Sequence, residues 1–435
     1  MMSEGEIQHR LDLLLRTGCL LMESGADTSR VMRTMKRVAA YMCLPLERLN
    51  MYIVYNMLMV NLPDRRQSFT RFQRVERHGI NLDTLRQASH LSCEAQRMGY
   101  SLDYYERQLS QIACQRRNYS PWQVAVGGGL ACGGFCIQFG CDWTAFFYAA
   151  LAAILGLRLR MWLGAVGSNA LVNTGVAAFV STLIAWAFSE LSQWASASDG
   201  AMGIFTSSTP WHPLLACALF IVPGVPLINF VSDILSGYTQ IGVTRAMETL
   251  TTLLAMAFGI AFAIRVCGID NFAKDLPMTP HHAYDEYSLA AAVSAIGFSM
   301  IFNTTPHLMG FVALGGIVSV CTRNFVNLGP SSGNIGLDLG LVVGSFVGSA
   351  VVSILCCALV RRLHTPHQLL SIPSVIPMIP GVLMYRALFA FINMHGVVGE
   401  VTVAMNYAIQ ASLIILFIAL GVAIPNVFFR RMIPA

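Results

Sequence analysis

The sequence predicts a mostly α-helical, polytopic membrane protein with ten transmembrane helices and a small α+β domain at its N-terminus. Three observations predict this fold class: an uneven distribution of charge, a series of apolar segments and a repeated set of motifs. Of the first 120 residues 29 are charged (24%), against 22 of the remaining 315 (7%). Because soluble domains are roughly a quarter charged, only the first part has the composition of a water-facing domain. The second part is expected to lie in a membrane.

The first 120 residues are expected to form a cytoplasmic α+β domain. Leucines at helical spacing, Gly25 as a helix terminator and Asn81 as a helix cap indicate where its helices lie. A run rich in β-branched and aromatic residues, with a turn at Pro63-Asp64, indicates a β-hairpin. The expected elements are helices over residues 4–24 and 28–42, a hairpin over 49–75, and helices over 81–98 and 102–116.

Ten apolar segments follow from Pro121 onward. They lie near residues 121–141, 143–162, 169–189, 212–236, 244–266, 287–304, 306–325, 335–360, 371–395 and 402–428. With the first domain in the cytoplasm, ten spans return the C-terminus to the cytoplasm. This orientation places seven arginines inside and three Lys or Arg residues outside, in agreement with the positive-inside rule. No secretory signal peptide is recognised, so the sequence predicts a multi-pass protein of the bacterial inner membrane.

The membrane part contains a repeat of three motifs, which recur in the same order at offsets of 157, 165 and 163 residues. The matched pairs are Pro223-Gly224 with Pro380-Gly381, Asn169-x3-Asn173-x-Gly175 with Asn334-x3-Asp338-x-Gly340, and Gly134-Phe135 with Gly297-Phe298. They predict two five-span repeats over residues 121–267 and 287–435, joined by a polar loop over 268–286. Because five is odd, the second repeat would enter the membrane from the opposite side. Such inverted-topology repeats are typical of secondary transporters.

Each repeat contains a Pro-Gly pair inside an apolar segment: Pro223-Gly224 in the first and Pro380-Gly381 in the second. Proline removes a backbone donor and glycine tolerates the bend, so each pair is expected to divide a helix into two half-helices. Interrupted spans at matching positions of two repeats point to a transport site, and half-helix N-termini suit a carboxylate. A plain proline kink that shapes packing is the alternative.

Polar residues shortly after the breaks supply the candidate substrate site. Arg386 is expected to bind a substrate carboxylate, Asn229 to add a hydrogen bond, and Asp233 to hold a cationic group or carry a proton. A charge deep in a bilayer costs at least ~3 kcal/mol, so these groups should face the protein interior or a wet cavity. The alternative is a structural ion pair between Arg386 and Asp233. Secondary candidates are Asn173, Asp338, Glu248 and Glu400.

Several other functions are disfavoured by what the sequence lacks. There is no Walker sequence, no H-E-x-x-H and no C-x-x-C pair, so an ATP-driven pump, a zinc protease and a metal site are not supported. No catalytic constellation is found, and no cofactor is implied. A net charge of +5 over 435 residues is too weak a signal for a nucleic-acid binder. A passive channel and a non-transporting membrane scaffold remain as alternatives.

Four segments resemble a known family in the same order: CLLMESGADTSRV, VPGVPLINFVSDILSG, AIGFSMIFN and VIPMIPGV. The chain resembles the threonine/serine exporter (ThrE) family, and within it a fusion of the two-component (YjjP/YjjB-type) exporter halves. The resemblance covers essentially the whole chain, with the Pro-Gly segments as its most specific part.

The resemblance implies export of threonine and serine driven by the proton-motive force, with protons and the lipid bilayer as further partners. The split members of the family imply dicarboxylates such as succinate instead. Both substrate classes carry a carboxylate, which agrees with the role expected for Arg386. The choice between amino acids and dicarboxylates stays open. The oligomeric state also stays open, and a homo-oligomer is one candidate.

Overall fold

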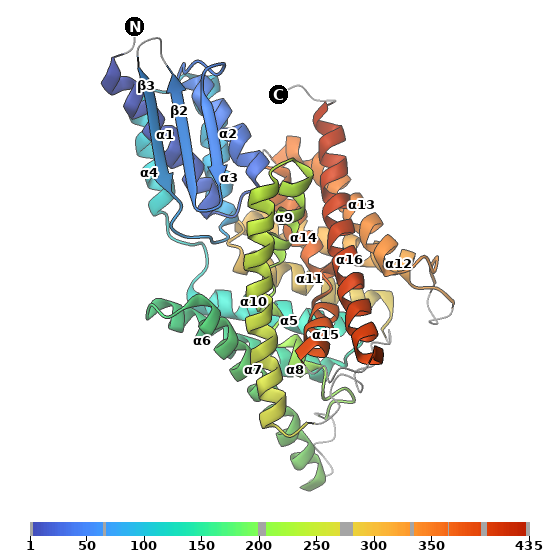
Figure 1. The fold of residues 1–435 in the computed structure, drawn as a ribbon. Coiled ribbons are helices and arrows are strands. Elements are labelled where there is room, and N and C mark those ends of the chain that lie inside the picture. The colour runs from blue at the N-terminus through green and yellow to red at the C-terminus, as the bar shows by residue number, and fades with distance from the viewer. Residues whose placement is uncertain are drawn as a thin grey trace.

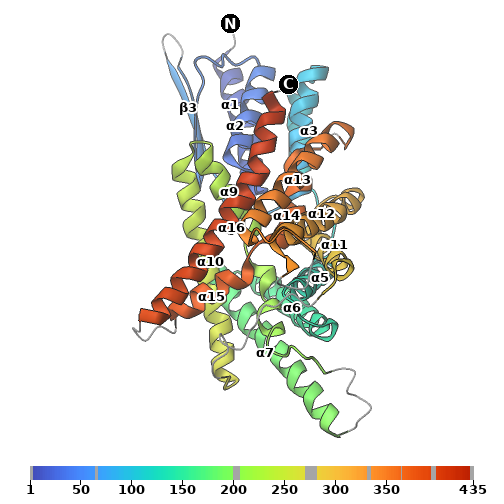
Figure 2. The same ribbon diagram turned by 90° about the vertical axis from the view of Figure 1, so that its right-hand side faces the viewer.

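The computed structural model describes residues 3–63, 67–198, 206–269, 282–330, 335–363, 365–392 and 398–431. These residues are mostly helical, with one three-stranded sheet near the N-terminus (Figure 1). Six helices are long and apolar enough to cross a membrane, and eight spans result if each of two bent helix pairs counts as one. The last helix, α16 (Val398–Arg431), ends at the same end of the molecule as the sheet (Figures 1 and 2).

We call the first four helices together with the sheet the N-terminal domain. Its helices pack around buried leucines. The antiparallel sheet has the order β1-β2-β3. Leu58, Val60 and Leu62 alternate along β2 on the face that is buried. The elements are α1 (Glu4–Glu23), α2 (Thr28–Tyr41), β1 (Asn50–Val54), β2 (Met57–Pro63), β3 (Ser68–Arg74), α3 (Leu82–Met98) and α4 (Leu102–Cys114).

The helix ends of this domain follow from local sequence, as expected. Asn81 caps α3 by accepting a hydrogen bond from the Thr84 amide. Gly25 follows α1 with a φ of +87°, a conformation that glycine adopts without steric penalty. The expected hairpin is present as the antiparallel pair β2 and β3, in which Pro63 pairs with Ser68. A third strand is not expected from the sequence: a two-residue turn at Tyr55-Asn56 folds the first apolar run into a hairpin of its own. Part of the expected Pro63-Asp64 turn lies outside the described residues.

The remaining chain, which we call the helical part, forms a helix or a broken helix at each of the ten expected apolar segments. Two of these, α5 and α11, are not among the candidate spans, since α5 is rich in glycine and α11 opens with acidic residues. The elements are α5 (Pro121–Gln138), α6 (Trp143–Ala165), α7 (Ala170–Ser198), α8 (Pro213–Ala216), η2 (Leu219–Ile221), α9 (Gly224–Leu235), α10 (Thr239–Val266), α11 (Tyr284–Ile301), η3 (Pro306–Leu308), α12 (Met309–Asn327), α13 (Leu341–Leu363), α14 (His367–Val375), η5 (Ile376–Met378), α15 (Gly381–Ile392) and α16.

The helices α5 and α11 open the two expected repeats, and they pack closely in antiparallel directions. Gly127 near the start of α5 faces Gly297 late in α11, whereas Gly134 late in α5 faces Ala290 early in α11. A Cβ at Gly134 would lie 2.6 Å from the Ala290 carbonyl oxygen, so only glycine permits this approach. Small residues of this kind let helix backbones come close in a membrane.

Both Pro-Gly pairs lie at sharp bends. The chain bends by 57° before α9 and by 55° before α15. The two bends face one another: a Cβ on Gly224 would lie 2.7 Å from Ile379 Cδ1, and a Cβ on Gly381 would lie 2.7 Å from Leu219 Cδ2. The half-helix N-termini therefore meet apolar side chains of the other bend.

We expect the replacement Gly297→Ala to destabilise the protein. The added methyl would lie 2.5 Å from the backbone nitrogen of Ala131, and overpacking of this kind costs roughly 1–3 kcal/mol. The measurement is the thermal unfolding midpoint of the purified protein in detergent. Gly310→Ala in α12 is the matched control, because no atom lies within 4 Å of its added methyl. Equal midpoints for the two variants would contradict the prediction.

Candidate functional site

A partly open cavity of about 330 Å³ lies beside the second Pro-Gly break. It is formed by the ends of α5 and α12, the starts of α11, α13 and α15, the break itself and α16. Because α5 begins next to the N-terminal domain and ends here, we call this space the far-side cavity. Its polar lining includes Gln138, Tyr287, Asn324, Asn327, Tyr407 and Gln410, together with two arginines.

The two arginines are Arg386, an expected site residue, and Arg323 at the end of α12. The Arg386 guanidinium lies over the ring of Tyr407, 5.5 Å from its centroid. Arg323 donates from Nε and Nη2 to the side-chain oxygen of Asn324, each at 3.1 Å. No Asp or Glu is among the described residues that line the cavity. Guanidinium groups bind carboxylates through paired N–H donors, so this lining suits a solute with one or two carboxylates.

Asn229 and Asp233 lie on α9 at the other end of the helical part, against the N-terminal domain. Residues 25–28, which join α1 to α2 and which we call the docking loop, fill the space beside them. Asn229 Nδ2 donates to the Gly25 carbonyl at 2.9 Å, and the Thr28 amide donates to Asp233 Oδ1 at 2.8 Å. The structure therefore brings Asn229 and Asp233 together but places Arg386 in a different site.

Asp233 forms its ion pair with Arg245 of α10 and not with Arg386. Arg245 Nε lies 3.1 Å from Asp233 Oδ2, and both side chains are buried. A buried pair is stable only when further hydrogen bonds satisfy its remaining polar atoms. The docking loop supplies them, since Arg245 Nη2 also donates to the Ala26 carbonyl at 2.8 Å.

The start of α2 also contacts the second half of the helical part. Arg30 Nε donates to Gln368 Oε1 of α14 at 2.7 Å, and both residues are buried. The segment from Gly25 to Arg30 thus joins α9 and α10 of the first half to α14 of the second. Both helices broken by a Pro-Gly pair are held by the same short segment of the N-terminal domain.

The secondary candidates lie outside both of these sites. Asn173 accepts a hydrogen bond at 2.6 Å from a serine hydroxyl five residues earlier, at the start of α7. Glu248 accepts a hydrogen bond from the Tyr55 hydroxyl at 2.6 Å. Asp338 precedes α13 with a φ of +53°, and Glu400 lies in the first turn of α16. None of the four is among the residues that line the far-side cavity.

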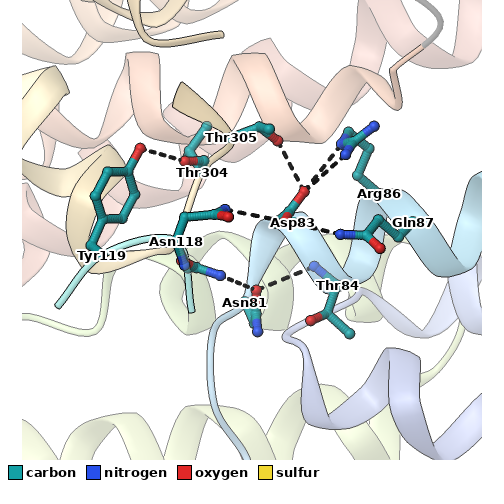
Figure 3. A network of polar contacts seen from close by, with 10 residues as sticks. Asn81, Asp83, Thr84, Arg86, Gln87, Asn118, Tyr119, Thr304 and Thr305 are labelled. Atoms are coloured by element: carbon teal, nitrogen blue, oxygen red, sulfur yellow. Dashed lines mark hydrogen bonds and ion pairs between the residues drawn. The ribbon is translucent and has the colours of Figure 1, made fainter. Parts of the chain in front are cut away.

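A second polar network joins the N-terminal domain to the connection between α11 and α12 (Figure 3). At its centre, the Asp83 carboxylate accepts five hydrogen bonds of 3.0–3.3 Å, two of them from Arg86. The Tyr119 hydroxyl donates to the Thr304 carbonyl at 2.7 Å, and burial raises the pKa of Tyr119 to about 12, so this donor stays protonated. The donors to Asp83 are Arg86, Gln87, Asn118 and Thr305.

The residues expected from the sequence to bind substrate do not include Arg245 or Arg323. In the sequence analysis both arginines serve only to assign the orientation in the membrane. Both nevertheless fall inside expected apolar segments, over residues 244–266 and 306–325. A charge within such a segment is costly and is therefore a functional candidate by default. That signal in the sequence could have identified them. Among the described residues, no group of three His, Cys, Asp or Glu side chains could hold a metal ion.

Comparison with known families decides the class of the protein. A family model described as "Putative threonine/serine exporter" matches residues 12–267, and a second, described as "Threonine/Serine exporter, ThrE", matches residues 287–428. The chain belongs to the threonine/serine exporter family. The resemblance noted in the sequence is thereby confirmed, and the family is one of transporters rather than enzymes. As a member of this family the chain is a multi-pass membrane protein.

Curated relatives match part of the chain or nearly all of it. The "Probable succinate transporter subunit YjjP" of Escherichia coli (strain K12) is 26% identical over 260 residues, 59% of this chain and 94% of that protein. The "Threonine/serine exporter" of Corynebacterium glutamicum is 20% identical over 429 residues, 97% of this chain and 83% of that protein. The "Probable threonine/serine exporter" of Mycobacterium tuberculosis (strain ATCC 25618 / H37Rv) is 20% identical over 393 residues, 88% of this chain and 70% of that protein. No solved structure matches the chain significantly.

We expect Asp83→Ala to loosen the N-terminal domain of this exporter from the α11–α12 connection. Hydrogen bonds to a charged group contribute about 1.5–3 kcal/mol, and the replacement removes five of them at once. Amide hydrogen exchange of residues 118–120 and 303–305 should rise. Asp103→Ala is the matched control, an exposed aspartate in the first turn of α4. Equal exchange in the two variants would refute a docking role for Asp83.

Proposed function

We propose that this chain is a secondary active exporter of small carboxylate-bearing solutes, threonine and serine, driven by the proton-motive force. In this proposal ten spans form two inverted five-helix repeats in the bacterial inner membrane, over residues 121–267 and 287–435. The N-terminal domain over residues 1–120 and the C-terminus face the cytoplasm. Transport proceeds by alternating access around the two Pro-Gly breaks. A homo-oligomer of this chain is compatible with such a mechanism.

The antiparallel packing of α5 against α11 supports the inverted repeats, because the first helices of two inverted copies must run in opposite directions. An apolar groove between α9, α10, α15 and α16 adds further support. Fourteen of its fifteen lining residues fall into seven pairs of equivalent positions in the two halves, 157 positions apart in α9 and α15 and 162 positions apart in α10 and α16. The pairs are Leu227 with Met384, Phe230 with Ala387, Val231 with Leu388, Ala246 with Ala408, Thr249 with Ala411, Leu250 with Ser412, and Leu253 with Ile415.

The observation that carries the proposal is the far-side cavity with Arg386 beside the second break. Its volume of about 330 Å³ lies at the lower end of the roughly 300–1,000 Å³ that is typical of ligand sites. The apolar contact between the two breaks separates this cavity from Asn229 and Asp233. A solute would pass when this contact opens, with the site accessible to one side of the membrane at a time.

The proposed function is tested by efflux from proteoliposomes that contain the full-length protein. Labelled threonine, serine and succinate are compared, each with and without a pH gradient. The proposal expects threonine and serine efflux that a gradient accelerates. Flux that is independent of the gradient would indicate a passive channel, and no flux of any of the three would refute transport of these solutes.

Arg386→Gln should weaken solute binding and lower efflux at subsaturating concentration. Loss of hydrogen bonds to a charged group costs about 1.5–3 kcal/mol, which corresponds to a roughly ten- to hundredfold higher half-saturating concentration. Arg386→Lys keeps the charge but loses the paired donors, so it should recover only part of the affinity. The control is Arg265→Gln, an exposed arginine near the end of α10. An unchanged half-saturating concentration in Arg386→Gln would remove Arg386 from the site.

A dicarboxylate is the second candidate substrate, and the pair Arg323 and Arg386 in one cavity favours it. Two guanidinium groups match two carboxylates, whereas the ammonium group of threonine would find no Asp or Glu among the described lining residues. If succinate is the substrate, Arg323→Gln should raise its half-saturating concentration about as much as Arg386→Gln does. If threonine is the substrate, Arg386→Gln should have the larger effect, because threonine has a single carboxylate. Parallel efflux assays of both solutes on both variants separate these outcomes.

A further inference from the structure

The far-side cavity has a counterpart at the other end of the helical part. Aligned on the Pro-Gly pairs, which are 157 positions apart, Asn229 corresponds to Arg386. Aligned on Gly259 and Gly421, which are 162 positions apart, Arg245 corresponds to Tyr407. These counterparts lie beside the N-terminal domain, where the docking loop occupies the space that is a cavity on the far side.

Most of the docking loop is buried in this space, and only Gly25 is partly exposed. Ala26 and Thr28 have no exposed surface, and Asp27 is only 4% exposed. Polar loop residues normally lie at a protein surface, where water satisfies their backbone groups. Here the backbone groups of the loop bond instead to side chains of the helical part, so this part presents a polar site that accepts a ligand of suitable chemistry.

The hydrogen bonds define that chemistry. Two acceptors of the loop, the carbonyls of Gly25 and Ala26, receive hydrogen bonds from Asn229 and Arg245. One donor, the Thr28 amide, points to Asp233. An α-amino acid offers the same set, since its carboxylate carries two acceptor oxygens and its ammonium group is a donor. Arginine binds a carboxylate more strongly than a neutral carbonyl, and aspartate binds an ammonium more strongly than an amide.

We propose that Asn229, Asp233 and Arg245 form a second solute site, which binds the carboxylate and ammonium groups of an amino acid entering from the side of the N-terminal domain. The docking loop occupies this site in its empty state and leaves when the solute binds. This inference rests on the proposed export of threonine and serine. Asp233 gives this site the acidic group that the far-side cavity lacks among its described lining residues.

The Arg30–Gln368 hydrogen bond holds the docking loop in place and sets its competition with the solute. When only a fraction of molecules has a vacant site, the apparent dissociation constant rises in inverse proportion to that fraction. A variant that weakens the hold of the loop therefore binds threonine more tightly, although neither Arg30 nor Gln368 is a ligand of the proposed site.

The first test measures hydrogen exchange of the full-length protein in detergent, with and without saturating threonine. Displacement of the docking loop predicts faster exchange in residues 25–31 when threonine is added. In parallel samples threonine is replaced by leucine, an amino acid with a bulkier side chain, or by sodium chloride, which controls for ionic strength. Unchanged exchange of residues 25–31 under conditions where threonine binds would overturn the inference.

The second test measures threonine affinity in matched variants by isothermal titration calorimetry. Arg30→Met and Gln368→Met remove the same hydrogen bond from opposite sides, so each should lower the dissociation constant several-fold. Arg107→Met, an exposed arginine of α4, is the control and should bind as the native protein does. Arg245→Lys and Asn229→Ala should raise the dissociation constant at least tenfold. The lysine in Arg245→Lys keeps a cation beside Asp233, so this variant is expected to fold.

The outcomes distinguish this inference from the proposed function. If the native protein exports threonine but the Arg245 and Asn229 variants bind it unchanged, the second site is refuted and the export function stands. If the native protein neither exports nor binds threonine or serine, both fail. Tighter binding in Arg30→Met together with weaker binding in Arg245→Lys supports displacement of the docking loop.

Discussion

The contact between the two Pro-Gly breaks is the constraint on which the arrangement of the helical part depends. A broken helix leaves backbone groups without helical partners, and a membrane tolerates such groups only where protein surrounds them. Each break therefore has to be covered, and in this chain each covers the other: Gly224 packs on Ile379 and Gly381 on Leu219. A side chain larger than glycine at either position would hold the breaks apart. The same contact is apolar, so it separates the polar far-side cavity from the polar groups beside the N-terminal domain.

The two ends of the helical part are built from corresponding positions but carry different chemistry. On the far side, Arg386 lies over Tyr407 in an accessible cavity. At the other end, the corresponding Asn229 and Arg245 bind backbone carbonyls of the docking loop, and Asp233 adds an acidic group. In our proposal, the two similar halves thus provide sites with unequal affinity for the same solute. An exporter needs such inequality, because a solute bound tightly on one side has to be released on the other.

The N-terminal domain is docked on both halves of the helical part and is not an appended module. It contacts the first half of the helical part through Asp233 and Arg245, the second half through Gln368, and the α11–α12 connection through Asp83. A domain bound to both halves resists any motion that separates them at this end. Alternating access requires that motion, so solute binding and domain docking are expected to be coupled energetically.

The sequence by itself determined the membrane class, the positions of the apolar helices, the Pro-Gly breaks and the family. These features depend on composition, on short-range periodicity and on residues adjacent in the chain. It also singled out Arg386, because a charge inside an apolar segment is costly wherever the segment packs. Only the tertiary structure decided the partners of the buried charges: Asp233 pairs with Arg245 and not Arg386, and Arg323 joins Arg386 in one cavity. Such pairings join residues far apart in the chain, and they depend on which helix faces pack together, which local sequence patterns do not specify.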